Sequence, residues 1–466
     1  MHYLRVLLFT AVIANLLIPV PTMSQVAAAG WVSDGEAGTF EFEFTRRLYH
    51  ESLVSARDWA DQNRSESNQT AEFAYGVTLF FGAVEGLIGD FSRYGMSRDD
   101  TMGIPFFRLF APANPAPEAI SYSEFRGIFQ RFDARLAEAR GVLAGIDDPE
   151  VTLAFRPMGV RIDLNGDGVY ATNERLLPVF NQITDPFSQP DEQYWSNAAG
   201  EIDAYVGRLA AGDPEALAQL DTIAPGFAYD RADAAWLAGY THLLSAFADV
   251  LLAHDLERQF DYGILAFFPD AETPYEPLRE IYQSLKFNPL FYADSAEIAP
   301  IFDVVAVVFG QTFEPASPER LSALRTDLLG MIAQSRRSWN FINAETDNLS
   351  GEPSTGFPEW VPGPHQSSLA GFPDVNERVR DAWLHFLDVF EGVLDGELLL
   401  PHWRFDKGVN LRKMLEKPKP WSPVLIVQGA DVVPYLEDGK IADARALEPV
   451  SMILGADFFT YAIWFN

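Results

Sequence analysis

The stretch Asp163-Leu-Asn-Gly-Asp-Gly-Val-Tyr-Ala-Thr-Asn-Glu174 is the most distinctive part of this 466-residue sequence. Asp163, Asn165, Asp167 and Glu174 stand at its first, third, fifth and twelfth positions. Gly168 stands at the sixth position, where a sharp backbone turn favours a residue without a Cβ atom. The spacing predicts an irregular loop whose side-chain oxygens gather around one point, and the rest of the fold is expected to hold that loop.

The pattern D-x-[DN]-x-[DN]-G-x5-E resembles the calcium-binding loop of the EF-hand family, in the form found in bacterial extracytoplasmic proteins. The resemblance implies a calcium ion (Ca2+) bound by oxygen atoms, including the main-chain carbonyl at position seven and a bidentate carboxylate at position twelve. Ala171 at position nine has no side-chain oxygen, so a water molecule is expected there. The predicted metal ligands are Asp163, Asn165, Asp167, Val169 and Glu174. The alternative is a plain surface turn, which Asn, Asp and Gly also build.

The segments that flank the loop depart from a helix-loop-helix unit. Pro157 and Gly159 disfavour a helix before the loop, so the entering segment is predicted to be a strand. A short helix is expected to begin at Glu174 and to be limited by Pro178. The sequence contains no second loop of this kind, so a paired EF-hand domain is not expected.

Residues 1–29 predict an export signal. A short basic start ends at Arg5, an apolar run extends from Val6 to Val20, and an A-x-A cleavage site precedes Gly30. The apolar run is too short to span a bilayer comfortably, and an uncleaved anchor is the alternative. Later apolar runs are interrupted by charges, so no transmembrane segment is predicted in the mature chain.

Composition indicates where the protein is located and which partners it is not expected to bind. The chain has no cysteine, and a chain of this length buries a full core without disulfides. Export without cysteine favours a bacterial periplasmic or secreted protein over a glycosylated eukaryotic one, although N-x-S/T sequons are present. The formal net charge of −32 repels phosphate backbones, so nucleic acid is not an expected partner.

Helical periodicity predicts a mainly α fold with minor β, as one large helical domain or two packed halves. The halves are residues 30–225, with the calcium loop, and residues 226–466. A faint echo between residues 143–165 and 394–411 favours a duplication, and similar composition is the alternative. The predicted helices are 40–62, 75–94, 123–143, 200–211, 231–260, 318–343 and 376–394, and the predicted strands include 424–427 and 458–465.

Residues 339–372 predict a long irregular loop that carries a second candidate site. A loop of this length is usually functional or disordered. Its aromatic rings would stack on a sugar, and its carboxylates would act as the acid and base of a glycosidase. The alternative is a surface lid whose tryptophans pack on the core. The candidate residues are Trp339, Glu345, Glu359, Trp360 and His365.

Three functions follow from these patterns. The first is an exported calcium-binding protein in which the ion serves the structure. The second is an extracytoplasmic hydrolase that acts on glycans through the 339–372 loop, and the third is a cell-envelope binding or assembly protein. The sequence contains no H-E-x-x-H motif, G-x-S-x-G motif or P-loop, so it leaves open whether the protein is an enzyme.

Overall fold

The computed structural model describes residues 38–96, 112–278, 306, 309–345, 360–366 and 375–442, except positions 66, 113, 172–173, 180–191, 211–212, 214, 225, 264–266. This part of the chain is mainly helical, with small antiparallel sheets of two, two and three strands. The predicted mainly α fold with minor β is therefore confirmed. The predicted export signal and the strand at 458–465 lie outside the described residues.

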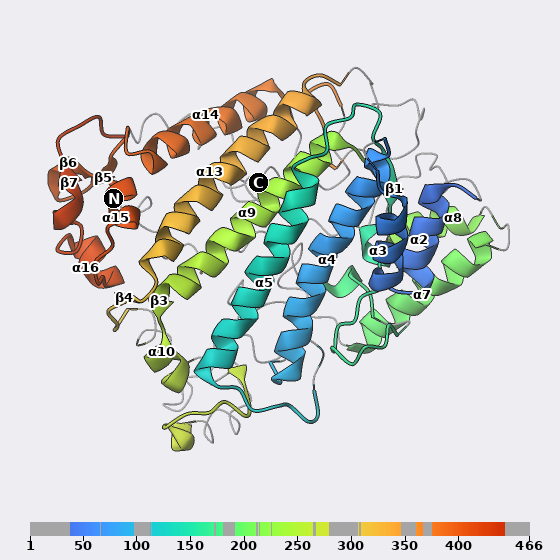
Figure 1. Ribbon diagram of the computed structural model, residues 1–466, viewed down its shortest axis with the longest axis horizontal. Helices are drawn as coiled ribbons and strands as arrows, with labels where there is room; N and C mark the ends of the chain where they lie inside the picture. The colour runs from blue at the N-terminus through green and yellow to red at the C-terminus, as the bar shows by residue number, and fades with distance from the viewer. Residues whose placement is uncertain are drawn as a thin grey trace.

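Five long helices lie side by side in one layer, in the order α4, α5, α9, α13, α14 (Figure 1). The predicted helices in these places are confirmed, with ends that differ by a few residues. Their bounds are Gln69–Arg93 for α4, Tyr122–Leu143 for α5, Arg231–Ala253 for α9, Pro318–Ile342 for α13 and Glu377–Leu394 for α14.

Helix starts in this layer are marked by local hydrogen bonds. In α5, the Glu124 N–H donates to Ser121 Oγ (3.3 Å), and the Ser121 N–H donates to Glu124 Oε2 (2.7 Å). This reciprocal pair is a capping box, and it satisfies two N–H groups that a helix start otherwise leaves unpaired. Asp230 and Asp233 form the same arrangement at the start of α9.

Helix α9 is buried between two cores. Ala234 and Leu237 pack into the core formed with α4 and α5, whereas Ala232 and Ala253 pack into the core formed with α13 and α14. Strand β2 (Phe227–Tyr229) pairs antiparallel with β1 (Leu153–Phe155). The two predicted halves therefore share a sheet and one continuous layer of helices.

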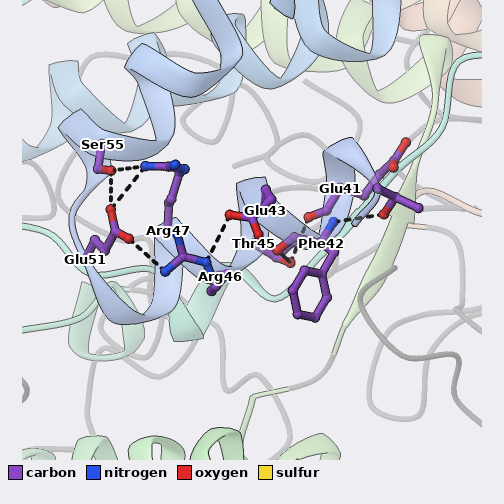
Figure 2. A network of polar contacts seen from close by, with 9 residues as sticks. Glu41, Phe42, Glu43, Thr45, Arg46, Arg47, Glu51 and Ser55 are labelled. Carbon is purple, nitrogen blue, oxygen red and sulfur yellow. Dashed lines mark hydrogen bonds and ion pairs between the residues drawn. The ribbon is translucent and has the colours of Figure 1, made fainter. Parts of the chain in front are cut away.

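The predicted helix at 40–62 is two helices, α2 (Phe40–His50) and α3 (Leu53–Asn63). Ser52 caps α3, because its Oγ accepts the N–H of Ser55 (3.0 Å). Figure 2 shows how the corner is held: Arg46 and Arg47 from α2 both bond to Glu51, and Arg47 Nη1 also donates to Ser55 Oγ (3.0 Å). A cap and two ion pairs thus replace the expected continuous helix.

Two other predicted helices have different bounds. Helix α7 (Glu192–Ala210) begins before residue 200 and is followed by α8 (Glu215–Ile223). The predicted helix at 231–260 is interrupted after Ala253 by β3 (His254–Asp255), and α10 (Glu257–Tyr262) follows it. The interruption arises because β3 pairs with β4 (Glu314–Pro315), a contact between residues far apart in the sequence.

The predicted strand at 424–427 is wrong, because this segment forms helix α16 (Pro423–Gln428). Proline is favoured in the first turn of a helix, and Gly429 ends α16 in the left-handed region, at φ 108°. The surrounding elements are β5 (Leu400–His402), β6 (Phe405–Val409), β7 (Leu436–Glu437) and α15 (Leu411–Glu416). They form a small unit at one end of the helical layer, beyond α13 and α14 (Figure 1).

Candidate metal centre

The predicted calcium loop, residues 163–174, is closed at its base by main-chain pairing. Arg161 and Arg175 form an antiparallel β-bridge, and the Ile162 N–H donates to the Glu174 carbonyl (3.3 Å). The predicted strand before the loop is only partly confirmed, because Arg161 is in the bridge but Pro157–Gly159 form a short 3-10 helix, η5. The predicted helix start at Glu174 is wrong, because Arg175 is in the bridge and helical residues begin at 177.

The Asp163 carboxylate lies at the centre of the turn. Its Oδ1 accepts the N–H groups of Gly166 (2.7 Å) and Asp167 (3.2 Å), and its Oδ2 accepts the N–H of Gly168 (2.8 Å). The N–H groups of three consecutive residues are therefore turned toward one acidic side chain. The residue is 9% exposed, so this carboxylate is largely removed from solvent.

The next two polar side chains continue the same inward arrangement. Asn165 Oδ1 accepts the N–H of Asp167 (2.8 Å), and Asp167 Oδ1 accepts the N–H of Val169 (2.7 Å). Asn165 Nδ2 also donates to Asp167 Oδ2 (3.3 Å). Side-chain oxygens from positions one, three and five are thus held by the loop's own backbone, as a turn with alternating acidic and amide residues allows.

Two glycines permit this backbone path. Gly166 has φ 75° and Gly168 has φ 81°, in the left-handed region that residues with a Cβ atom rarely adopt. Gly166 also lies against α4, where a Cβ atom added to it would be 3.5 Å from the Gly89 backbone. The loop therefore packs closely on the C-terminal half of α4.

Glu174 returns from the far end of the loop to the same region. Its Oε2 accepts the N–H of Ala171 (3.1 Å), and the residue is 5% exposed. Burial raises the pKa of Glu174, and the negative charges of Asp163 and Asp167 raise that pKa further. A cation bound among these carboxylates would offset both effects.

Helix α4 contributes a carboxylate that the sequence analysis missed. Glu85 Oε2 accepts the N–H of Asp163 (3.0 Å), and Glu85 Oε1 accepts the hydroxyl of Tyr170 (3.2 Å). Burial is the main reason why the pKa of Glu85 rises to about 7. One feature of the sequence does point to Glu85, because it is the one charged residue of α4 between Glu72 and Asp90.

The two arginines that flank the loop hold it to the end of α2. Arg161 donates from its N–H to the Leu48 carbonyl (2.9 Å) and from Nη1 to the His50 carbonyl (2.8 Å). Arg175 Nη2 donates to the Tyr49 carbonyl (3.3 Å). The last carbonyls of a helix have no partner within it, so these bonds satisfy groups that need one.

Asp203 of α7 joins the same two arginines. Its carboxylate accepts Arg161 Nη2 at 3.0 and 3.2 Å and also bonds to Arg175 Nη2. The Arg175 side chain is fully buried, and burial lowers its pKa to about 10. The sequence analysis missed this ion pair, because its members are remote in sequence and no motif links them.

An open cleft of about 720 Å³ lies beside the loop. One wall is the loop itself, another is α4, and the third is the segment around residues 114–118. The cleft is lined by Glu85, Gly86, Gly89, Asp90, Ser92, Arg93, Asn114, Pro115, Glu118, Asp163, Asn165, Gly166 and Asp167. One edge of the loop is therefore reachable from solvent.

All five predicted ligands lie within this one loop, and their chemistry fits a hard cation. Within the described ranges, no three His, Asp or Glu side chains are grouped at metal-binding spacing. The carboxylates instead accept main-chain N–H groups, as described above. A carboxylate provides about four lone-pair sites, so accepting N–H bonds leaves sites on Asp163, Asp167 and Glu174 for an ion.

The second candidate site is only partly described. Trp339 lies in α13 and is 1% exposed, so it belongs to the core, and the irregular segment begins after Ile342. Trp360 packs edge-on against Phe227 and Trp236, with ring centroids 5.1 and 5.8 Å away.

A hydrogen bond joins two polar residues of that segment. Glu345 Oε2 accepts Gln366 Nε2 (3.2 Å), next to His365. Glu359 lies outside the described residues.

Helices α4 and α9 are long and apolar enough to cross a membrane, and more than half of the apolar stretch in each is buried inside the fold. Comparisons with known proteins find no family model, no curated protein and no solved structure that matches this chain.

Proposed function

We propose that this chain is an exported calcium-binding protein in which the ion stabilises the fold. The observation that supports the proposal is the loop geometry. The side-chain oxygens of Asp163, Asn165 and Asp167 face the inside of a turn with Gly168 at its sixth position, and Glu174 returns buried beside them. Calcium prefers oxygen ligands on a flexible loop of this length.

Electrostatics give the ion its effect on stability. Asp163, Asp167 and Glu174 bring negative charge together in a partly buried place, which costs free energy without a cation. An ion that binds only the folded loop stabilises the protein by mass action, by about 2.7 kcal/mol at one hundred times its dissociation constant. Extracellular calcium modules work with dissociation constants of about 10⁻⁴ to 10⁻³ M.

The position of the loop makes this role structural. The loop contacts α4 through Gly89 and Glu85, and its flanks contact α2 and α7 through Arg161 and Arg175. These helices are far apart in the sequence and meet at this loop. Calcium would therefore strengthen the contact between the helical layer and the α2–α7 side of the molecule.

Thermal unfolding with calcium and with a chelator tests the proposal. The melting temperature is expected to be higher in calcium, and the Glu174→Ala variant is expected to lose the difference, because the bidentate carboxylate is removed. Glu138→Gln on the exposed face of α5 is the control and should keep it. Equal melting temperatures in calcium and chelator, with no calcium binding by calorimetry, would leave a plain Asp/Asn/Gly turn.

A glycan hydrolase finds less support. Trp339 is buried in the core, and Trp360 packs on two core aromatics, as expected for a lid.

A further inference from the structure

Lysine is concentrated in one small part of this chain. We define the basic module as residues 399–442, which contain the elements from β5 to β7. Five of the six lysines in the chain lie in this module. With seven Lys and Arg against five Asp and Glu, the module has a net charge of +2, whereas the whole chain has −32. The remaining residues therefore carry −34, and the charges are strongly segregated.

The module also exposes a cluster of large apolar side chains. We define the apolar patch by its members, which are Trp403 (51% exposed), Val424 (51%), Leu425 (41%), Val427 (38%) and Val433 (53%). They are half of the ten large hydrophobic residues that are exposed in the described part of the chain. The other five are scattered from residue 54 to residue 309, so this is a concentration rather than the usual scatter.

A hydrogen bond joins two members of the patch that come from different elements. Trp403 Nε1, in the turn between β5 and β6, donates to the Val427 carbonyl of α16 (2.9 Å). The chain turns after α16, where the Val433 N–H donates to the Ala430 carbonyl (3.4 Å). Helix α16 exposes Val424, Leu425 and Val427, although the outward face of a surface helix is normally polar.

The module that carries this patch also carries exposed cationic side chains. The Arg404 guanidinium lies over the Trp403 ring, 4.3 Å from its centroid. Lys417 and Lys419 precede α16 and are exposed, as is Lys440. Within the described ranges, none of these four side chains forms an ion pair with a carboxylate, whereas Lys407 and Lys413 of the module are paired with Asp438 and Glu437.

We propose that this face of the basic module docks on an anionic lipid bilayer. Aliphatic side chains and a tryptophan enter the interfacial region of a bilayer, and lysine and arginine bind the anionic headgroups around them. The module lies at one end of the helical layer (Figure 1), so the acidic remainder of the chain can point away from the membrane. Repulsion from that remainder is screened over about 8 Å at physiological ionic strength.

A second copy of the chain fits this face less well. A second copy offers abundant carboxylates for the lysines, but the patch also needs an apolar surface opposite it. In the described part of the chain, the exposed large hydrophobics outside the module are scattered in sequence, as Val54, Val250 and Tyr275 are, and pairing the patch with the same patch of a second copy would bring like-charged side chains together. The proposal does not depend on calcium binding, because none of the loop residues belongs to the module.

Vesicle co-sedimentation of the full chain tests the proposal. Vesicles that contain phosphatidylglycerol are expected to bind the protein, vesicles of phosphatidylcholine alone are expected to bind it weakly, and high salt should reduce the difference. Lys417→Gln with Lys419→Gln should weaken binding about thirtyfold, because each lysine near an anionic surface contributes about 1 kcal/mol. Val424→Ser with Leu425→Ser should weaken binding to both kinds of vesicle.

The matched control is Val54→Ser with Val250→Ser, which removes two similarly exposed valines outside the module. Residues 1–29 are present in every variant, so differences between variants report on the module alone. Circular dichroism checks that each variant is folded. Equal vesicle binding by all variants would overturn the proposal, and so would a wild-type dimer in sedimentation velocity that the Val424→Ser, Leu425→Ser variant loses.

Discussion

The 163–174 loop and the basic module differ in where they place charged side chains. Around the loop, Asp163, Glu174 and Arg175 are buried, and each bonds to main-chain groups or to an opposite charge. In the module, Lys417 and Lys419 are exposed, and large apolar side chains are exposed beside them. The first region removes charge from water to define one backbone path. The second leaves both charge and apolar surface available to a partner.

The difference shows which kind of polar residue specifies structure. A buried charge without partners is costly, so the loop region is stable only in an arrangement that pairs its buried carboxylates and guanidinium groups. An exposed ion pair contributes little and specifies little. We therefore expect substitutions around the loop to affect the whole fold, and substitutions in the module to act locally or on binding.

The largest decrease in the free energy of unfolding is expected for Asp203→Ala. This change leaves the buried Arg175 guanidinium without its carboxylate, and breaking a buried pair costs about 3–5 kcal/mol. The corresponding change in the module, Glu437→Ala, removes exposed contacts with Asn410 and Lys413 and should cost about 0–1 kcal/mol. Urea unfolding gives both free energies of unfolding. Comparable losses would mean that the two regions do not differ in this way.

Glu201→Ala is the control for that measurement. Glu201 is exposed on α7, two residues before Asp203, and exposed substitutions are usually within about 0.5 kcal/mol of neutral.

A smaller change in the free energy of unfolding is expected when the pH changes, through the Glu85 carboxyl group. Burial raises the pKa of Glu85 from 4.5 to about 7, so the folded protein binds this proton more tightly than the unfolded chain. The contribution of Glu85 to stability is therefore present at low pH and is lost as the pH rises from about 4.5 to about 7. In chelator, wild type should lose on the order of 1–2 kcal/mol relative to Glu85→Gln over this range, with solvent screening counted.

For Glu437 in the module, we expect stability to change with pH in the opposite direction. Hydrogen bonds from Asn410 and Lys413 lower the pKa of Glu437, so its contribution is present above pH 4.5 and is lost as the pH falls through the lowered value. Urea unfolding of wild type, Glu85→Gln and Glu437→Gln from pH 3 to pH 8 separates the two. A wild-type curve parallel to that of Glu85→Gln would contradict the assignment to Glu85.

The smallest effect is expected for Gly429→Ala. Gly429 has φ 108°, and a Cβ atom there would be 2.9 Å from the Phe405 ring. The strain should cost about 1 kcal/mol or somewhat more. Hydrogen exchange should accelerate in residues 399–442 and stay unchanged in 160–176, because the module has its own small core of Val409, Val432 and Tyr435.

Gly200→Ala provides the contrast for that experiment. Gly200 lies in α7, and a Cβ atom there would contact nothing within 4 Å, so alanine should stabilise the helix by about 1 kcal/mol.

Faster hydrogen exchange in both regions, 399–442 and 160–176, after Gly429→Ala would show that the module is coupled to the whole fold.

Local patterns made part of this structure predictable. The helix start at Ser121 depends on Glu124, three residues away, and α14 begins in a similar way, because Asn376 Oδ1 accepts the N–H groups of Arg378 and Val379. The same holds for the turn around Asp163, because the groups that bond to it lie within five residues. Such interactions are visible in sequence because chain connectivity alone brings the partners together.

Short apolar runs were less predictable. The Val424–Val427 run fits a strand or a helix, and Pro423 with Gly429 makes it a helix. The helix after Ala253 is interrupted because β3 finds a partner at Glu314, about sixty residues further along the chain. Periodicity within a segment does not show which remote segment will pair with it.

The sequence by itself determined the order of the oxygen-bearing side chains in 163–174 and the helical character of the chain, because both depend on residues close together. The tertiary structure decided which groups surround the loop. Glu85 and Asp203 come from α4 and α7, and they meet the loop only after the helices have packed. The burial of Trp339 in a core and the exposure of Leu425 on an apolar patch were likewise decided by packing, because burial is a property of the surrounding elements and not of the residue.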